Sequence, residues 1–170
     1  MRALVVGRFQ PVHKGHVALI ARALEDCQQV VVGIGSAASK TSLRNPFTAA
    51  ERRQLIAAAF PQEVASGRLT IVDVPDINNP PRWVEHVIGI TGAIDRVFGN
   101  DDDTLALFDM ANIPVASPGL MDRERCEAST IRVQLAEDDP AWRKAVPAAV
   151  AALLDQWGAG RRLRGLEAVA

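Results

Sequence analysis

Cysteine is scarce in this chain of 170 residues. Its two cysteines, Cys27 and Cys126, form no C-x-x-C pair and no cluster with histidine, so we expect neither a disulfide framework nor a zinc site. The sequence also lacks the run of about 18 apolar residues that a membrane-spanning helix needs. The apolar run at residues 3–7 is too short for the core of a secretion signal. These absences predict a soluble cytoplasmic protein.

Net charge is nearly absent as well. Nineteen basic and 20 acidic side chains give a formal charge of -1, which is unlike a nucleic-acid coat protein or a polybasic membrane binder. The charges are unevenly placed, because residues 1–50 carry six basic and two acidic side chains and the first acid is Glu25. This balance excludes a bulk polyanion as partner, but the cationic N-terminal part suits a small polyanionic molecule.

The length and composition fit one globular domain. Hydrophobic residues make up 48% of the chain and charged residues 23%, which is typical of a folded rather than a disordered chain. We predict a single domain over residues 1–157. The segment 158–170 is basic and poor in apolar residues before Leu163, so we expect it to be a mobile C-terminal tail.

Short β-prone apolar runs alternate with helical periodicity along the sequence. The strand-like runs cover residues 4–7, 30–35, 69–74, 96–98 and 113–116. Helical spacing covers residues 16–24, 48–60, 83–90, 104–110, 128–137 and 140–156. Thr48 and Glu51 form a capping-box pattern at one helix start, and Pro61 ends that helix. The alternation predicts an α/β fold with a doubly wound, mostly parallel sheet and C-terminal helices.

Two of the three histidines lie in the turn after the first predicted strand, which reads GRFQPVHKGH from Gly7 to His16. This turn contains neither G-x-G-x-x-G nor G-x-x-x-x-G-K-[ST], so the usual dinucleotide fingerprint and the P-loop are absent. Instead, H-x-G-H stands at a helix start, where free N–H groups and the helix dipole favour an anion. Arg8 and Lys14 add positive charge. We therefore predict a polyphosphate site, and two purely structural histidines are the alternative.

The decapeptide resembles the signature of the (H/T)-x-G-H nucleotidylyltransferase superfamily, and most of the chain is similar to the archaeal-type nicotinamide-nucleotide adenylyltransferases. Arg44 to Arg52 matches their R-x-P-F-T-A-x-E-R segment. Shorter matches are G-I-G-S-A at 33–37, W-V-x-H at 83–86, G-N at 99–100, the serine and arginine at 129 and 132, and W-R-x-x-V-P at 142–147. The resemblance implies a Rossmann-like nucleotidylyltransferase fold. It also implies that the adenylyl group of ATP is transferred directly to nicotinamide mononucleotide (NMN), giving NAD and pyrophosphate.

The resemblance also implies roles for particular residues. The implied catalytic residues are Arg8, His13, His16 and Arg132, with His16 nearest the transferring α-phosphate. The implied ATP-binding residues are Gly7, Arg8, Phe9, His13, Lys14, Gly15, His16, Ser129 and Arg132. The implied NMN-binding residues are Ser36, Arg44, Asn79 and Trp83. No protein ligand for a metal is expected, and Mg²⁺ is held mainly by the ATP phosphates.

Several of these residues have a plain structural alternative. Lys14 can be a solvated residue of a helix face. Arg44 can contact the polyphosphate of ATP in place of the NMN phosphate, or it can be an arginine of a surface loop. Trp83, the candidate for stacking on a cationic nicotinamide ring, can be a core residue. Asn79 can serve a backbone turn, as can its neighbours Asp76 and Asn78, while Trp142 and Trp157 are predicted to pack. Two departures from the family pattern, Ala128 in place of glycine and Pro80 in place of an amide side chain, bear on acceptor specificity.

The predicted partners are ATP and NMN, in a homo-oligomer that is often a hexamer in this family, with no nucleic acid and no membrane. The same chemistry on nicotinic acid mononucleotide, phosphopantetheine or flavin mononucleotide, or with CTP as donor, is the alternative enzyme. A nucleotide sensor without catalytic activity is the alternative from another class.

Overall fold

One parallel sheet of five strands forms the centre of the computed structural model, which describes residues 1–119 and 127–170. The order across the sheet is β3-β2-β1-β4-β5. The strands are β1 (Arg2–Gly7), β2 (Gln29–Gly35), β3 (Leu69–Val74), β4 (Arg96–Phe98) and β5 (Val115–Ala116). The predicted fold class, a doubly wound parallel α/β sheet, is confirmed.

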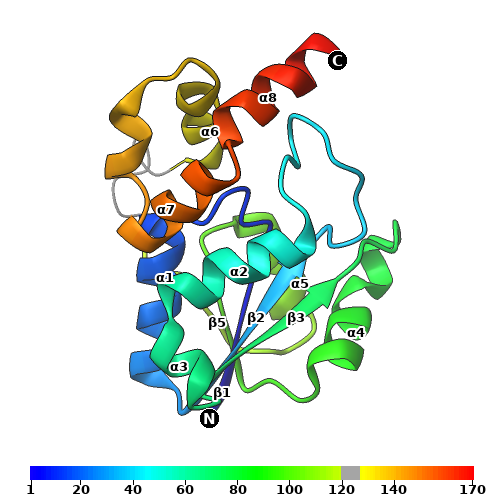
Figure 1. The fold of residues 1–170 in the computed structure, drawn as a ribbon. Coiled ribbons are helices and arrows are strands. Elements are labelled where there is room, and N and C mark those ends of the chain that lie inside the picture. Colours follow the sequence, from blue (N-terminus) through cyan, green and yellow to red (C-terminus); the bar gives the residue numbers. More distant parts are fainter. Residues whose placement is uncertain (120–126) are drawn as a thin grey trace.

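Helices connect the strands and extend the chain beyond the sheet (Figure 1). Those between strands are α1 (Lys14–Asp26), α2 (Ala49–Ala59), α3 (Pro61–Ala65), α4 (Pro80–Thr91) and α5 (Asp102–Met110). The C-terminal ones are α6 (Ala128–Ala136), the 3₁₀-helix η1 (Pro140–Lys144), α7 (Ala148–Gln156) and α8 (Ala159–Ala168). None of the helices in the described parts of the chain has the length and apolar content of a membrane span.

Strand β1 lies in the middle of the sheet and is buried on both faces. Leu4 is in register with Val31 of β2 on one side and with Val97 of β4 on the other. Because side chains alternate along a strand, Ala3 and Val5 join the apolar cluster under α1, α2 and the C-terminal helices, whereas Leu4 joins the cluster under α4 and α5. The chain moves outward from β1 to β3 and then returns to β4 beside β1. This reversal puts a topological switch point at the carboxyl ends of β1 and β4, where α/β sheets bind ligands.

The C-terminal region differs from the sequence prediction. A single helix over 140–156 was expected, and that is wrong, because residues 145–147 separate η1 from α7. Pro147 has no N–H to donate to the preceding turn, and its ring disfavours the helical conformation at Val146. Pro61 does end α2, as expected, but it also begins the short helix α3, in whose first turn its missing N–H is tolerated.

Residues 159–168, which the sequence analysis assigned to a tail, form helix α8. Ala159 and Leu163 are each 1% exposed, and a Cβ atom on Gly160 would lie 2.5 Å from the carbonyl oxygen of Leu135 in α6. Small residues therefore let α8 approach α6 closely, so this helix packs with very little apolar side chain. The low apolar content of the segment was the reason for predicting a tail.

Candidate active site

A cavity of about 380 Å³ opens at the switch point between β1 and β4. It is lined by eight of the nine residues predicted to bind ATP, namely Gly7, Arg8, Phe9, His13, Gly15, His16, Ser129 and Arg132. The ninth, Lys14, is exposed and does not line it, which agrees with the alternative of a solvated helix face. The cavity thus joins the first turn of the chain to the start of α6, more than a hundred residues later.

The two histidines of the H-x-G-H motif cap the N-terminus of α1 reciprocally. The backbone N–H of His16 donates to Nδ1 of His13 at 3.4 Å, and the backbone N–H of His13 donates to Nδ1 of His16 at 3.2 Å. This is a capping box in which imidazoles replace the usual hydroxyl and carboxylate. The rings stack with their centroids 3.7 Å apart. The spacing of three residues is therefore a requirement of the cap itself.

The cap also determines the protonation of both rings. Each Nδ1 accepts a hydrogen bond, so the proton of each neutral ring is on Nε2. Burial lowers the pKa of His13 to about 4. Burial, and secondarily the neighbouring His13, hold the pKa of His16 well below its ordinary value. At neutral pH the pair is therefore uncharged, and each ring keeps one N–H donor on Nε2.

Phe9 packs against His16 of this pair. Its φ of 53° lies in the left-handed region, which is uncommon for a bulky residue and is found mainly where the surrounding structure enforces it. The ring is 1% exposed and lies 4.7 Å from the His16 ring, centroid to centroid. A Cβ atom on Gly7 would lie 3.1 Å from the Phe9 ring. Glycine at position 7 therefore makes room for Phe9, and Phe9 in turn packs against His16.

Three arginines repel one another around the cavity. Arg8 and Arg132 line it, and Arg44 lines an adjacent cavity of about 340 Å³ that shares Ser129 and Arg132 with the first. Burial lowers the pKa of Arg8 and of Arg132, and the charge of Arg44 lowers both further. Arg132 donates from Nη1 to the carbonyl oxygen of Gln10 at 2.9 Å. Like charges held together in this way favour a bound anion.

Arg52 fixes the loops that carry this site. Its side chain is 1% exposed and, among the residues that the structure describes, donates only to backbone carbonyls. Nη1 reaches the oxygens of Arg8 at 2.8 Å and Gly35 at 2.7 Å, Nη2 that of Ser36 at 3.2 Å, and Nε that of Thr48 at 3.3 Å. One guanidinium thus joins the ends of β1 and β2 to the start of α2. Arg52 is the last residue of the R-x-P-F-T-A-x-E-R segment, but the sequence predicted no role for it.

The residues predicted to bind NMN are dispersed. None of the four lines the 380 Å³ cavity. Ser36 has a φ of 48° and is bound through its carbonyl oxygen by Arg52, whereas Asn79 lines a separate groove along α4. Trp83 is partly buried and packs edge-on against Phe108, with the ring centroids 5.6 Å apart, against the apolar cluster under α4 and α5. This contact agrees with the alternative reading of Trp83 as a core residue.

Besides the apolar Val5, Val6 and Leu19, four further residues that line the cavity were not predicted to bind ATP. They are Asn100, Asp101, Glu127 and Ala128. The first two follow β4 after Gly99, and the G-N match at 99–100 together with the strand-end rule could have found them. Oδ1 of Asn100 is buried and has no hydrogen-bond partner in the described part of the chain. Ala128 begins α6 in helical conformation, so a side chain is accommodated at this departure from the family pattern.

The fold and the site together define a class, and comparison with known proteins agrees. Residues 4–73, the first two βα units and β3, match the family described as cytidylyltransferase-like. With an H-x-G-H cap at the switch point of a doubly wound sheet, the chain is a nucleotidyltransferase.

The particular family follows from near-full-length relatives. Over 98% of its length the chain is 37% identical to the nicotinamide-nucleotide adenylyltransferase of Picrophilus torridus and covers 97% of that protein. It is 38% identical to the enzyme of the same name from Ignicoccus hospitalis, covering 98% of each chain. The chain belongs to the nicotinamide-nucleotide adenylyltransferase family, which confirms the resemblance seen in the sequence.

A solved structure shares the fold. It is a bifunctional NMN adenylyltransferase/ADP ribose pyrophosphatase from Francisella tularensis, complexed with AMP and a manganese ion. The TM-score is 0.73 at 20% identity, over 98% of this chain and 52% of that one. The chain therefore spans about half of that bifunctional protein.

Proposed function

We propose that this protein transfers the adenylyl group of ATP to NMN, giving NAD and pyrophosphate. The observation that carries the proposal is the cavity at the carboxyl ends of β1 and β4. There, two neutral imidazoles on a helix N-terminus line the same cavity as Arg8 and Arg132. Membership of the nicotinamide-nucleotide adenylyltransferase family supports NMN as the acceptor.

The chemistry needs positioning and charge stabilisation more than it needs a nucleophile from the protein. An oxygen of the NMN phosphate attacks the α-phosphorus of ATP, and the bond from that phosphorus to the bridging oxygen of the β-phosphate breaks. Pyrophosphate leaves with that electron pair, and no covalent enzyme intermediate forms. The Nε2–H groups of His13 and His16 donate to oxygens of the α-phosphate, where negative charge increases in the transition state. Arg8 and Arg132 bind the β- and γ-phosphates of the leaving group.

Mg²⁺ fits this site as an ion carried by the nucleotide. Among the described residues, no three histidine, cysteine or acidic side chains gather to hold a metal. Asp101 lines the cavity, but its carboxylate caps α5 by accepting from the backbone N–H of Thr104 at 2.9 Å. Phosphate oxygens and water therefore supply the Mg²⁺ ligands in this proposal, and the ion neutralises phosphate charge when bound.

On the acceptor side, we assign Arg44 to the phosphate of NMN, because it lines the cavity that adjoins the first through Ser129 and Arg132. Roles for Ser36, Asn79 and Trp83 in binding NMN stay predictions. The cytoplasmic location and the homo-oligomer also stay predictions, and light scattering on the purified protein measures the latter.

The test is an acceptor panel with product identification. The purified protein is incubated with ATP, Mg²⁺ and either NMN, nicotinic acid mononucleotide, phosphopantetheine or flavin mononucleotide, and a parallel reaction contains CTP instead of ATP. We expect NAD and pyrophosphate in equal amounts from ATP and NMN. Product from another acceptor but none from NMN would overturn the proposal. ATP binding without any product would identify a nucleotide sensor.

A further inference from the structure

Helix α8 contacts two parts of the candidate site at once. It packs on α6, which carries Ser129 and Arg132, and Nη1 of Arg164 donates to the carbonyl oxygen of Ala136 at 3.1 Å. Its Leu163 also lines the 340 Å³ cavity together with Arg44. In Figure 1 the loop before α2 lies beside α8 at the carboxyl end of the sheet. The C-terminal helix is therefore placed to influence how Arg44 lies relative to Arg132.

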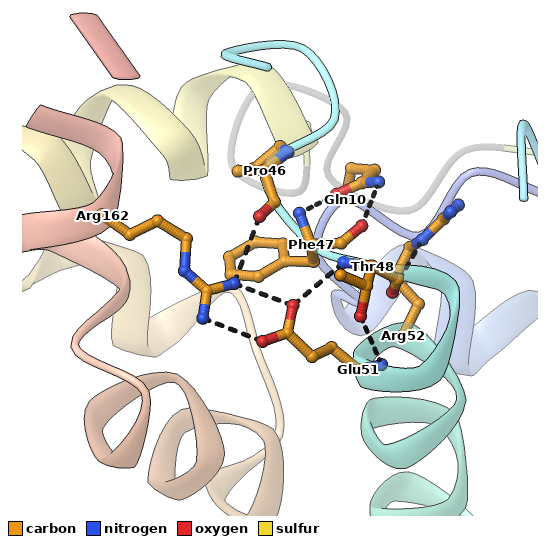
Figure 2. A network of polar contacts seen from close by, with 7 residues as sticks. All are labelled: Gln10, Pro46, Phe47, Thr48, Glu51, Arg52 and Arg162. Carbon is orange, nitrogen blue, oxygen red and sulfur yellow. Dashed lines mark hydrogen bonds and ion pairs between the residues drawn. The ribbon is translucent and has the colours of Figure 1, made fainter. Parts of the chain in front are cut away.

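Arg162 makes the link between α8 and this loop. Its guanidinium forms a two-bond ion pair with Glu51, both bonds being 2.8 Å, and Nη1 also donates to the carbonyl oxygen of Pro46 at 3.2 Å (Figure 2). It lies 5.6 Å from the centroid of the Phe47 ring. The two ion-paired side chains are 27% and 20% exposed, so solvent screens this pair less than a typical surface pair.

Glu51 is itself fixed by the start of α2. Its Oε2 accepts from the backbone N–H of Thr48 at 2.9 Å, and the Thr48 hydroxyl accepts from the backbone N–H of Glu51 at 3.1 Å. Burial alone would raise the pKa of Glu51, but the hydrogen bonds from Arg162 and Thr48 lower it overall. The carboxylate is therefore a charged anchor through which Arg162 holds this end of α2.

The segment of residues 46–48 is also hydrogen-bonded to the turn between β1 and α1. The side-chain amide of Gln10, 2% exposed, donates to the carbonyl oxygen of Phe47 at 2.9 Å and accepts from its N–H at 3.0 Å. The carbonyl oxygen of Gln10 accepts from Arg132. Residues 46–48 are therefore held from two sides, by α8 and by the first turn, as Figure 2 shows.

Arg44 lies two residues before Pro46, in a closed turn. The N–H of Ser42 donates to the carbonyl oxygen of Asn45 at 3.2 Å, and the N–H of Asn45 donates to that of Ser42 at 3.1 Å. Because this turn is closed at Asn45, the residue next to Pro46, we infer that the position of Pro46 affects where Arg44 lies.

We propose that Arg162 is a positioning residue for the acceptor substrate. By holding Pro46 and Glu51 it sets the position of Arg44 relative to Arg132, and so the site of the acceptor phosphate beside the triphosphate of ATP. This inference rests on the proposed function, because it assumes that Arg44 binds the phosphate of NMN.

The test compares Arg162→Met with Arg162→Lys and with the control Arg164→Met. The control removes another arginine of α8, which bonds Asp138 and Ala136 and, within the part of the chain that the structure describes, forms no hydrogen bond or ion pair with the segment from Pro46 to Glu51. For Arg162→Met we expect the KM for NMN to rise about tenfold while the Kd for ATP stays within about twofold, since small misplacements of positioning groups have large kinetic effects. Arg162→Lys should recover part of the loss. Arg164→Met should keep the wild-type KM.

Circular dichroism and thermal unfolding show first whether each variant is folded at the assay temperature. An unchanged KM for NMN in folded Arg162→Met, or an equal rise in Arg164→Met, would overturn the inference. If Arg162→Met does not fold, Glu51→Gln and Arg162→Lys replace it in the test. We then expect the KM for NMN to rise about threefold in each, and a wild-type KM for NMN in both would overturn the inference. A wild-type protein that makes no NAD would instead refute the proposed function, so the two failures are distinct.

Discussion

Arg52 provides a sharp test of how the candidate site is built. Its buried guanidinium donates four hydrogen bonds to backbone carbonyls from three separate stretches of chain. Burial lowers its pKa, and no carboxylate is hydrogen-bonded to it in the described part of the chain. Arg52→Met keeps much of the volume and removes every one of these donors.

The expected loss of stability follows from the number of bonds. Each hydrogen bond from a charged donor contributes about 1.5–3 kcal/mol, so four would contribute roughly 6–12 kcal/mol. The methionine avoids the cost of burying a charge, which offsets several kcal/mol of this. We expect Arg52→Met to lower the free energy of unfolding by about 3 kcal/mol. For a chain of this size, such a loss corresponds to a fall in Tm of about 6–12 °C.

The assay is urea and thermal unfolding of the wild type, Arg52→Met and the neighbouring variant Arg53→Met. Arg53 bonds the carbonyl oxygen of Ile71 and pairs with Asp73 at 2.8 Å, and the two charged side chains of that pair are 43% and 50% exposed. Arg53→Met removes one hydrogen bond from a charged donor and a solvent-screened ion pair, so it should lose less, about 1–2 kcal/mol. Equal losses in the two variants, or a loss below about 1 kcal/mol for Arg52→Met, would refute the view that Arg52 holds the loops together.

Three further predictions concern the site and its surroundings. Because the pKa of His13 in the folded protein, about 4, lies below the ordinary value of 6.5, the unfolded state binds the proton first. Stability from this group should be complete above about pH 6.5, fall as the pH drops toward 4, and fall less in His13→Asn, as measured by urea unfolding at each pH. Arg8→Met should relieve repulsion and leave the free energy of unfolding equal or up to about 1 kcal/mol higher, while calorimetry shows ATP binding at least tenfold weaker. Trp83→Ala should lose about 2–3 kcal/mol in urea unfolding because of the contact with Phe108, whereas unchanged stability with a raised KM for NMN would identify stacking on the substrate.

The fold was predictable where local pattern and tertiary structure agree. The apolar run at β1 and the capping box at Thr48 are local signals, and both elements form as expected. The break before α7 was missed because the Ala- and Leu-rich periodicity outweighed Pro147. Helix α8 was missed because close approach through Gly160 and the pairing of Arg162 replace apolar burial there. Neither is visible in the composition of the segment.

Some residues of the candidate site were predictable from the sequence and others were not. His13, Gly15 and His16 are contiguous in sequence, so one turn revealed them, and the structure adds that the two imidazoles cap α1 through each other. The role of Arg52 depends on carbonyl groups from distant loops, which no sequence pattern displays. A tryptophan at position 83 suits both core packing and stacking on a substrate, so the sequence alone left both roles open.

The central claim is that adenylyl transfer takes place at the H-x-G-H cap, where the neutral imidazole of His16 stabilises the transferring phosphate. The most direct measurement is the rate of NAD formation from ATP and NMN by wild type and His16→Ala, together with the Kd for ATP by calorimetry. The account predicts a fall in kcat of about 100-fold to 1000-fold, as for the loss of a donor to a developing charge, with the Kd for ATP changed only a few-fold. An unchanged kcat in His16→Ala would contradict it.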